Sequence, residues 1–95
     1  MDILLSKEAL RAYATTRRNM KIKTAIREIK AAIIKNAGNG ETECIVQIVP
    51  KNALHCILNN PCVEIDIVME VYTALQSIIG DLEHSITDTT IHFKW

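Results

Sequence analysis

The sequence predicts an α+β domain in which two or three helices pack on one face of a small, three-stranded, mainly antiparallel sheet. Two stripes of apolar residues at helical spacing, within residues 22–33 and 68–79, indicate amphipathic helices. The segments "ECIVQIV" and "TTIHFKW" have the β-branched and alternating character of strands. A chain of 95 residues with a hydrophobic fraction of 48% is long enough for one modest core. Residues 1–95 are therefore interpreted as a single domain.

The first helix is expected to begin after Ser6, whose hydroxyl suits an N-cap. It weakens at "TTRRN", where helix propensity is poor but no proline or glycine forces a break. Residues 6–37 are therefore expected to form either one bent helix or two helices. The stronger part carries a stripe of isoleucines at spacings of four, three and four: Ile22, Ile26, Ile29 and Ile33. Gly38 is expected to end this helix in the left-handed conformation.

The middle of the chain contains a strand and a second helix. Residues 43–49 are apolar on both faces apart from Gln47, which suits a central strand, and Pro50 ends it. The next segment, "KNALHCILNN", fits either a short helical turn or irregular chain. A second helix is expected from about residue 64 to Gly80, although "VEIDI" also alternates like a strand.

The C-terminal segment "LEHSITDTTIHFKW" is expected to form a β-hairpin. A short loop around Asp88 and Thr89 gives a register with three apolar or partly apolar pairs: Ile86 with Ile91, His84 with Phe93, and Leu82 with Trp95. One face of the hairpin is then apolar except for His84. This face is expected to cover the helices.

Composition indicates the cellular compartment in which the protein is expected. No apolar run approaches the roughly 18 residues that cross a bilayer, and the N-terminus lacks the pattern of a secretory signal. Three cysteines, an odd number without framework spacing, favour reduced thiols. We therefore expect a cytoplasmic protein with no membrane partner.

Charge is divided unevenly along the chain. Residues 1–35 carry nine basic and three acidic side chains, a net charge of +6, while residues 36–95 carry two basic and eight acidic ones, a net charge of −6. Such a division either provides a basic surface for an acidic partner or lets two parts of one fold attract each other. Sequence alone leaves both interpretations open.

The glycines of "NAGNGETE" do not predict a phosphate site. Phosphate-binding loops place glycines before a helix, whereas these glycines follow a helix C-terminus, where the dipole is negative. Glu41 and Glu43 add further negative charge. The expected role of these glycines is to stop the helix, and no small-molecule ligand is predicted.

Metal binding and catalysis are not predicted either. The hairpin register places His84 and His92 on opposite faces of the sheet, so they could not bind the same ion. The side chains that zinc prefers also lack the paired spacing of a zinc site; they are Cys44, His55, Cys56, Cys62, His84 and His92. No signature of a nucleophilic cysteine surrounds any of the three thiols. We expect no metal, no cofactor, no catalytic residues and no enzymatic activity.

Two surfaces are candidates for binding. The basic face of the helix at 17–35 offers six cations for contact with nucleic acid: Arg17, Arg18, Lys21, Lys23, Arg27 and Lys30. The alternative is a solvated helix face, because aromatic residues make up only 4% of the chain. Ile34 lies beside the isoleucine stripe and is the candidate residue for self-association, by helix on helix or by edge strands.

Three segments of the C-terminal half resemble a pattern of small uncharacterised α+β proteins of large DNA viruses and tailed phages. They are "NGETECIVQIV" after a basic helix, "SIIGDLEHS" at the end of an amphipathic helix, and "TTIHFKW" at the C-terminus. The resemblance covers about residues 22–95 and concerns structure, so it carries over no functional residue. It implies a viral protein located in the host cell cytoplasm.

Together these observations predict a small intracellular binding or assembly protein, most simply a homodimer. The alternative is a nucleic-acid-binding protein that uses the basic helix face.

Overall fold

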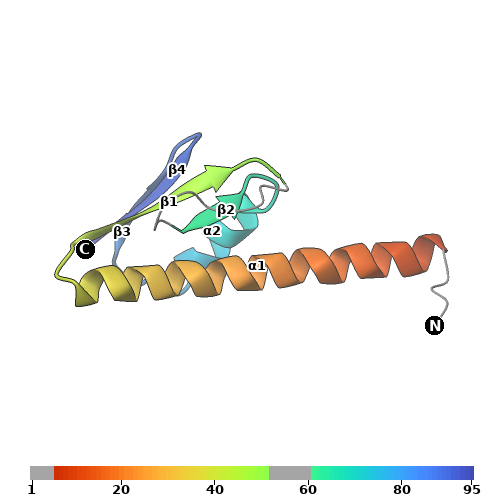
Figure 1. Ribbon diagram of the computed structural model, residues 1–95, viewed down its shortest axis with the longest axis horizontal. Helices are drawn as coiled ribbons and strands as arrows, with labels where there is room; N and C mark the ends of the chain where they lie inside the picture. The colour runs from red at the N-terminus through yellow and green to blue at the C-terminus, as the bar shows by residue number, and fades with distance from the viewer. Residues whose placement is uncertain (1–5, 52–60) are drawn as a thin grey trace.

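The structure is a computed structural model that describes residues 6–51 and 61–95. Its elements, in chain order, are α1 (Lys7–Gly38), β1 (Glu43–Val49), β2 (Cys62–Glu64), α2 (Val68–Gln76), β3 (Glu83–Ile86) and β4 (Thr90–Lys94). The α+β class is confirmed. Both helices lie on the same side of the sheet, and α1 runs along the whole length of the molecule (Figure 1).

α1 is one continuous helix of 32 residues, which settles the choice between one helix and two. The hydroxyl of Ser6 accepts a hydrogen bond from the backbone N–H of Ala9 at 3.1 Å, so the predicted N-cap is confirmed. At the weak "TTRRN" segment, the Thr16 hydroxyl donates to the carbonyl of Ala12 at 2.9 Å. Poor propensity without a proline or glycine therefore does not interrupt the helix.

The end of α1 differs from the expectation. Helical structure includes Gly38, and the left-handed residue is Gly40, with φ of 84°. Asn39 extends the helical hydrogen bonding because its N–H reaches the carbonyls of Lys35 and Asn36, both at 3.1 Å. The prediction that Gly38 adopts the left-handed conformation is therefore wrong by two residues.

The sheet has four strands in the order β2-β1-β4-β3, one more than predicted. The additional strand is β2, which pairs in parallel with β1 and places Val63 beside Ile48. The second helix was expected from about residue 64, so β2 was not predicted and only Glu64 belongs to both; the strand-like alternation of "VEIDI" prevails at its start, and Val63 is buried. The other two pairings are antiparallel, so the sheet is mixed.

The predicted hairpin is confirmed in its central register. Ile86 lies opposite Ile91, and His84 lies opposite Phe93. The expected pairing of Leu82 with Trp95 lies beyond the ladder, which begins at Glu83. Instead, the N–H of Trp95 donates to the carbonyl of Thr42 at 2.9 Å, which joins the end of the chain to the start of β1.

The second helix is shorter than predicted: of its expected first residues, Glu64 ends β2 and residues 65–67 form a turn. α2 buries four side chains of the predicted stripe: Val68, Val71, Tyr72 and Leu75. Gly80 follows in a left-handed turn with φ of 61°, three residues before β3 begins at Glu83. α2 therefore contributes one apolar face to the core and leaves Met69 exposed.

The core lies between the helices and one face of the sheet. Its largest fully buried side chains come from both helices and from the sheet. They include Ile29 of α1, Leu75 of α2, and Val46, Ile91 and Phe93 of the sheet. The isoleucine stripe of α1 faces this core, with Ile29 fully buried and its neighbours partly buried. Only the part of α1 beyond Arg17 takes part in this packing.

Candidate binding surfaces on helix α1 and at the opposite end of the molecule

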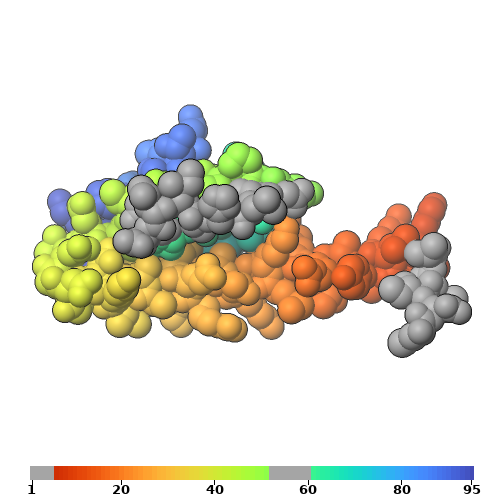
Figure 2. All heavy atoms as spheres, viewed as in Figure 1, coloured from red at the N-terminus to blue at the C-terminus, as the bar shows by residue number. Residues whose placement is uncertain are grey.

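The first three turns of α1, residues 7–17, project beyond the rest of the molecule (Figures 1 and 2). We call this segment the arm. None of its side chains is buried, and its two large apolar residues, Leu10 and Tyr13, are 48% and 66% exposed. The arm accounts for the elongated shape, 52 Å along one axis and 27 and 25 Å along the others.

Two of the six predicted nucleic-acid residues attach α1 to the rest of the fold. Arg18 donates to the backbone carbonyl of Asp66 at 3.1 Å and forms an ion pair with Glu70. Lys21 forms an ion pair with Glu64 at 3.0 Å. These contacts occur where the arm meets the body. Part of the opposite charge of the two parts of the chain therefore forms ion pairs within the fold, between α1 and the segments that follow it.

The other four predicted residues, Arg17, Lys23, Arg27 and Lys30, are exposed and have no ion pair within residues 6–51 and 61–95. Lys23, Arg27 and Lys30 follow spacings of four and three, so they share the outer face of α1. Arg17 lies at the base of the arm. The structure therefore does not bring all six cations onto one surface.

Ile34 is the most exposed large apolar residue described, at 70%. It lies on the outer face of α1, close to the C-terminal end of the helix. Met20, 53% exposed, precedes it by fourteen residues, a spacing that places both residues on nearly the same side of a helix. The predicted self-association residue is thus available at the surface.

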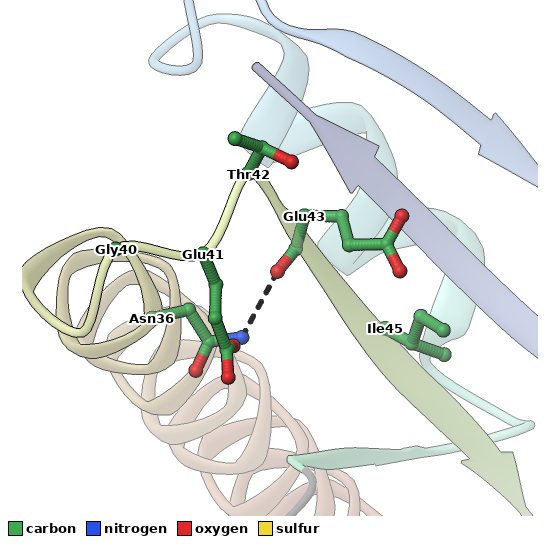
Figure 3. A pocket seen from close by; sticks show the side chains of 6 residues that line it. All are labelled: Asn36, Gly40, Glu41, Thr42, Glu43 and Ile45. Carbon is green, nitrogen blue, oxygen red and sulfur yellow. Dashed lines mark hydrogen bonds between the residues drawn. The ribbon is translucent and has the colours of Figure 1, made fainter.

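A cleft of about 440 Å³ lies between the C-terminal end of α1 and the start of β1 (Figure 3). The side chain of Asn36 donates to the backbone carbonyl of Glu43 at 3.1 Å, which holds the loop against the helix. Glu41 and Glu43 line the cleft, together with Gly40. With two carboxylates beside the negative end of a helix dipole, the cleft suits a cation.

A second cleft, of about 430 Å³, lies at the same end of the sheet and is lined by Asp81, Leu82, Glu83, Lys94 and Trp95. The register places it beside the first, because Lys94 pairs with Glu43 on one side and with Glu83 on the other. We call Glu41, Glu43, Asp81 and Glu83 together the acidic end. It lies at the opposite end of the molecule from the arm (Figure 1).

The cysteines and histidines do not form a common site in the described residues. Burial, and secondarily the charge of Glu41, raises the pKa of the Cys44 thiol, which lies in the core. Cys62 is disulfide-bonded, so the expectation of reduced thiols is wrong for that residue. His84 Nδ1 lies 2.6 Å from the Tyr72 hydroxyl, whereas His92 contacts Glu43 on the other face of the sheet.

Within the described part of the chain, no group of three side chains is placed to hold a metal ion. Two of the candidate zinc ligands, His55 and Cys56, lie outside the described residues, as does most of the ambiguous segment "KNALHCILNN". Neither α1 nor α2 combines the length and apolar character of a membrane span.

The chain matches no family model, no curated protein and no solved structure. The arguments about function therefore rest on the surfaces described above. The arm and the acidic end are the two that sequence reasoning missed. The opposite net charges of residues 1–35 and 36–95 were a signal for both surfaces. The sequence did not indicate that the two surfaces lie at opposite ends of the molecule.

Proposed function

We propose that the protein is an assembly module in which the arm of one copy binds the acidic end of a second copy. The observation that supports this most strongly is the arm itself. In folded proteins most helical stability comes from packing an apolar face, so a helical segment without such packing is only weakly stable. The arm has 11 residues and exposes Leu10 and Tyr13. A partner would supply the packing that its own fold does not.

Charge complementarity favours a second copy as the partner. The arm carries Lys7, Arg11 and Arg17 against a single acidic residue, Glu8. The acidic end carries four exposed carboxylates, of which Glu43 contacts His92. Two copies placed antiparallel bring each arm beside the other copy's acidic end. The same contact then occurs twice around a twofold axis, which closes the assembly as a dimer.

Apolar groups at the acidic end complete the proposed contact. Ile34 is exposed one turn before the end of α1, and Leu82 and Trp95 are partly exposed in the second cleft. These side chains would cover Leu10 of the partner's arm. Burying apolar surface contributes about 25 cal/mol per Å² to the free energy of association. Burial of these side chains would therefore stabilise the dimer.

The outer faces of two α1 helices are less suitable for pairing with each other. Among the described residues, no carboxylate pairs with Lys23, Arg27 or Lys30 on this face, so two copies would place like charges together. The other helix arrangement considered from sequence, isoleucine stripe against isoleucine stripe, would use side chains that pack against the core. The proposed dimer uses arm against acidic end instead and includes Ile34, which lies near the C-terminal end of α1.

Sedimentation equilibrium at micromolar concentration tests the proposal. The wild-type mass should approach twice the chain mass of 10.7 kDa. Leu10→Glu and Ile34→Glu should each shift it toward the monomer, because a charge would be buried in an apolar contact. Met69→Glu is the matched control, since Met69 is 56% exposed on α2 and belongs to neither the arm nor the acidic end. A monomeric wild-type mass at every concentration would overturn the proposal.

A charge exchange sharpens the same experiment. Arg11→Glu and Glu41→Arg should each weaken the dimer, and the double variant should recover much of the loss. Recovery requires the two residues to approach each other across the interface. Losses that simply add in the double variant would exclude the proposed pairing of arm and acidic end, even if the protein is a dimer.

A further inference from the structure

A cavity of about 410 Å³ lies at the base of the arm, where α1 leaves the body of the molecule. Three parts of the chain form it: one side of α1, the residues that follow β1, and the loop before α2. It is lined by Tyr13, Ala14, Arg17, Arg18, Lys21, Lys51 and Asp66. We call this cavity the notch. Nothing in the linear sequence connects Lys51 with Arg17, so only the fold reveals it.

The notch has an excess of positive charge. Four cationic side chains line it against one carboxylate, that of Asp66. Arg18 and Lys21 are held by carboxylates of the body, which fixes their positions. Arg17 and Lys51 have no ion pair in the described part of the chain. Two unneutralised cations that share one cavity match the charge of a phosphate group, which carries nearly two negative charges at neutral pH.

An aromatic ring lies beside these cations. Tyr13 is 66% exposed and precedes Arg17 by one helical turn, so both side chains project from the same side of α1 into the lining of the notch. Exposed aromatic rings next to cations are the arrangement by which proteins hold nucleotides, since the base stacks on the ring while the phosphate meets the charge.

We propose that the notch binds nucleotide phosphates, with Arg17 and Lys51 contacting the phosphate group and Tyr13 stacking on the base. The nucleotide is either free or part of a single-stranded nucleic acid, because both present a phosphate group beside a base; the terminal phosphate of a free nucleotide carries nearly two negative charges, and each phosphate of a strand carries one. This inference does not depend on self-association. The notch shares Tyr13 and Arg17 with the arm, but Leu10, Ile34 and the acidic end contribute nothing to its lining.

Titration of the full chain with three probes tests the inference: ATP, a single-stranded 12-mer of thymidylate, and inorganic pyrophosphate. ATP or the 12-mer should bind about tenfold more tightly than pyrophosphate, because stacking of one base contributes about 1–3 kcal/mol. Tighter binding of ATP identifies a free nucleotide as the ligand, and tighter binding of the 12-mer identifies a single strand. Pyrophosphate binding as tightly as both would overturn the assignment of Tyr13 as a stacking residue.

Variants separate the notch from diffuse attraction to a basic helix. Arg17→Gln and Lys51→Gln should each weaken binding about tenfold, since a hydrogen bond to a charged group contributes about 1.5–3 kcal/mol. Lys30→Gln removes the same charge from the outer face of α1 and should leave binding unchanged. Tyr13→Ala should reduce the preference for ATP over pyrophosphate.

Two results would contradict the inference: no binding of any probe at millimolar concentration, or an equal loss in Lys30→Gln and Lys51→Gln. The second result would support contact of nucleic acid with the whole basic face instead. Ile34→Glu should retain nucleotide binding even if it prevents dimerisation. Failure of the dimer and failure of the notch are therefore distinguishable.

Discussion

The two parts of α1 have the same secondary structure but different support. From Arg18 onward, the helix contacts the body through ion pairs at its start and through buried Ala25 and Ile29 further along. The arm, residues 7–17, has a good N-cap at Ser6 but no buried side chain. The difference shows that capping and propensity set where the helix runs, whereas apolar packing sets which part of it is stable by itself.

The largest expected difference between the two parts concerns core packing. Ile29→Ala should lower the free energy of unfolding by about 2–5 kcal/mol, because Ile29 is fully buried and its loss leaves a cavity. Leu10→Ala should change it by less than about 0.5 kcal/mol in dilute protein, because Leu10 is 48% exposed and belongs to the arm, which has no buried side chain. Urea denaturation of both variants gives the comparison. Equal losses would mean that the arm is packed as firmly as the rest of α1.

A smaller effect is expected where the two parts meet. Arg18→Ala should lower the free energy of unfolding by about 0.2–1 kcal/mol, because its ion pairs with Asp66 and Glu70 are largely exposed to solvent. Arg17→Ala, one residue earlier and without an ion pair among described residues, is the matched control and should have no effect. A loss of several kcal/mol for Arg18→Ala would show that this contact holds the fold together rather than orienting the helix.

The smallest effect concerns the buried thiol of Cys44, whose pKa is raised by burial and by Glu41. In the unfolded chain the thiol ionises at its ordinary value of 9.0, so the unfolded state loses its proton first as the pH rises. The stabilising contribution is complete below that pH and declines above it. The free energy of unfolding should therefore fall as the pH rises above 9.0, and fall less steeply in Cys44→Ala. Parallel slopes would exclude this role for Cys44.

Sequence patterns predicted those elements whose stability comes from their own apolar stripe. The isoleucines of α1 and the alternation in β4 correctly predicted where these two elements lie in the chain. Each element buries one apolar face against the core, and that face sets the period of its sequence. β2 was not predicted because three residues are too few to show a period, and its strand exists through pairing with β1. Gly38 was preferred to Gly40 because local rules do not show where helical hydrogen bonding stops.

The candidate surfaces could be predicted only in part. The basic residues of α1 were found, but carboxylates of β2 and α2 determine that Arg18 and Lys21 form ion pairs, whereas Arg17 forms none in the described part of the chain. The notch also requires Lys51, which reaches the base of the arm only because β1 ends there. Such surfaces combine residues from several elements, so they can be located only when the tertiary structure is known. The pattern of a single sequence does not show which distant residues meet.

Amide hydrogen exchange along α1, measured at two protein concentrations, tests most directly the claim that the arm depends on a second copy. At low concentration, amides of residues 7–17 should exchange nearly as fast as in an unfolded peptide, while those around Ile29 should be protected to the level of global unfolding. At high concentration the arm should gain protection as the dimer forms, and the amides around Ile29 should not. Arm protection that is strong in dilute protein, or that stays unchanged with concentration, would contradict the account.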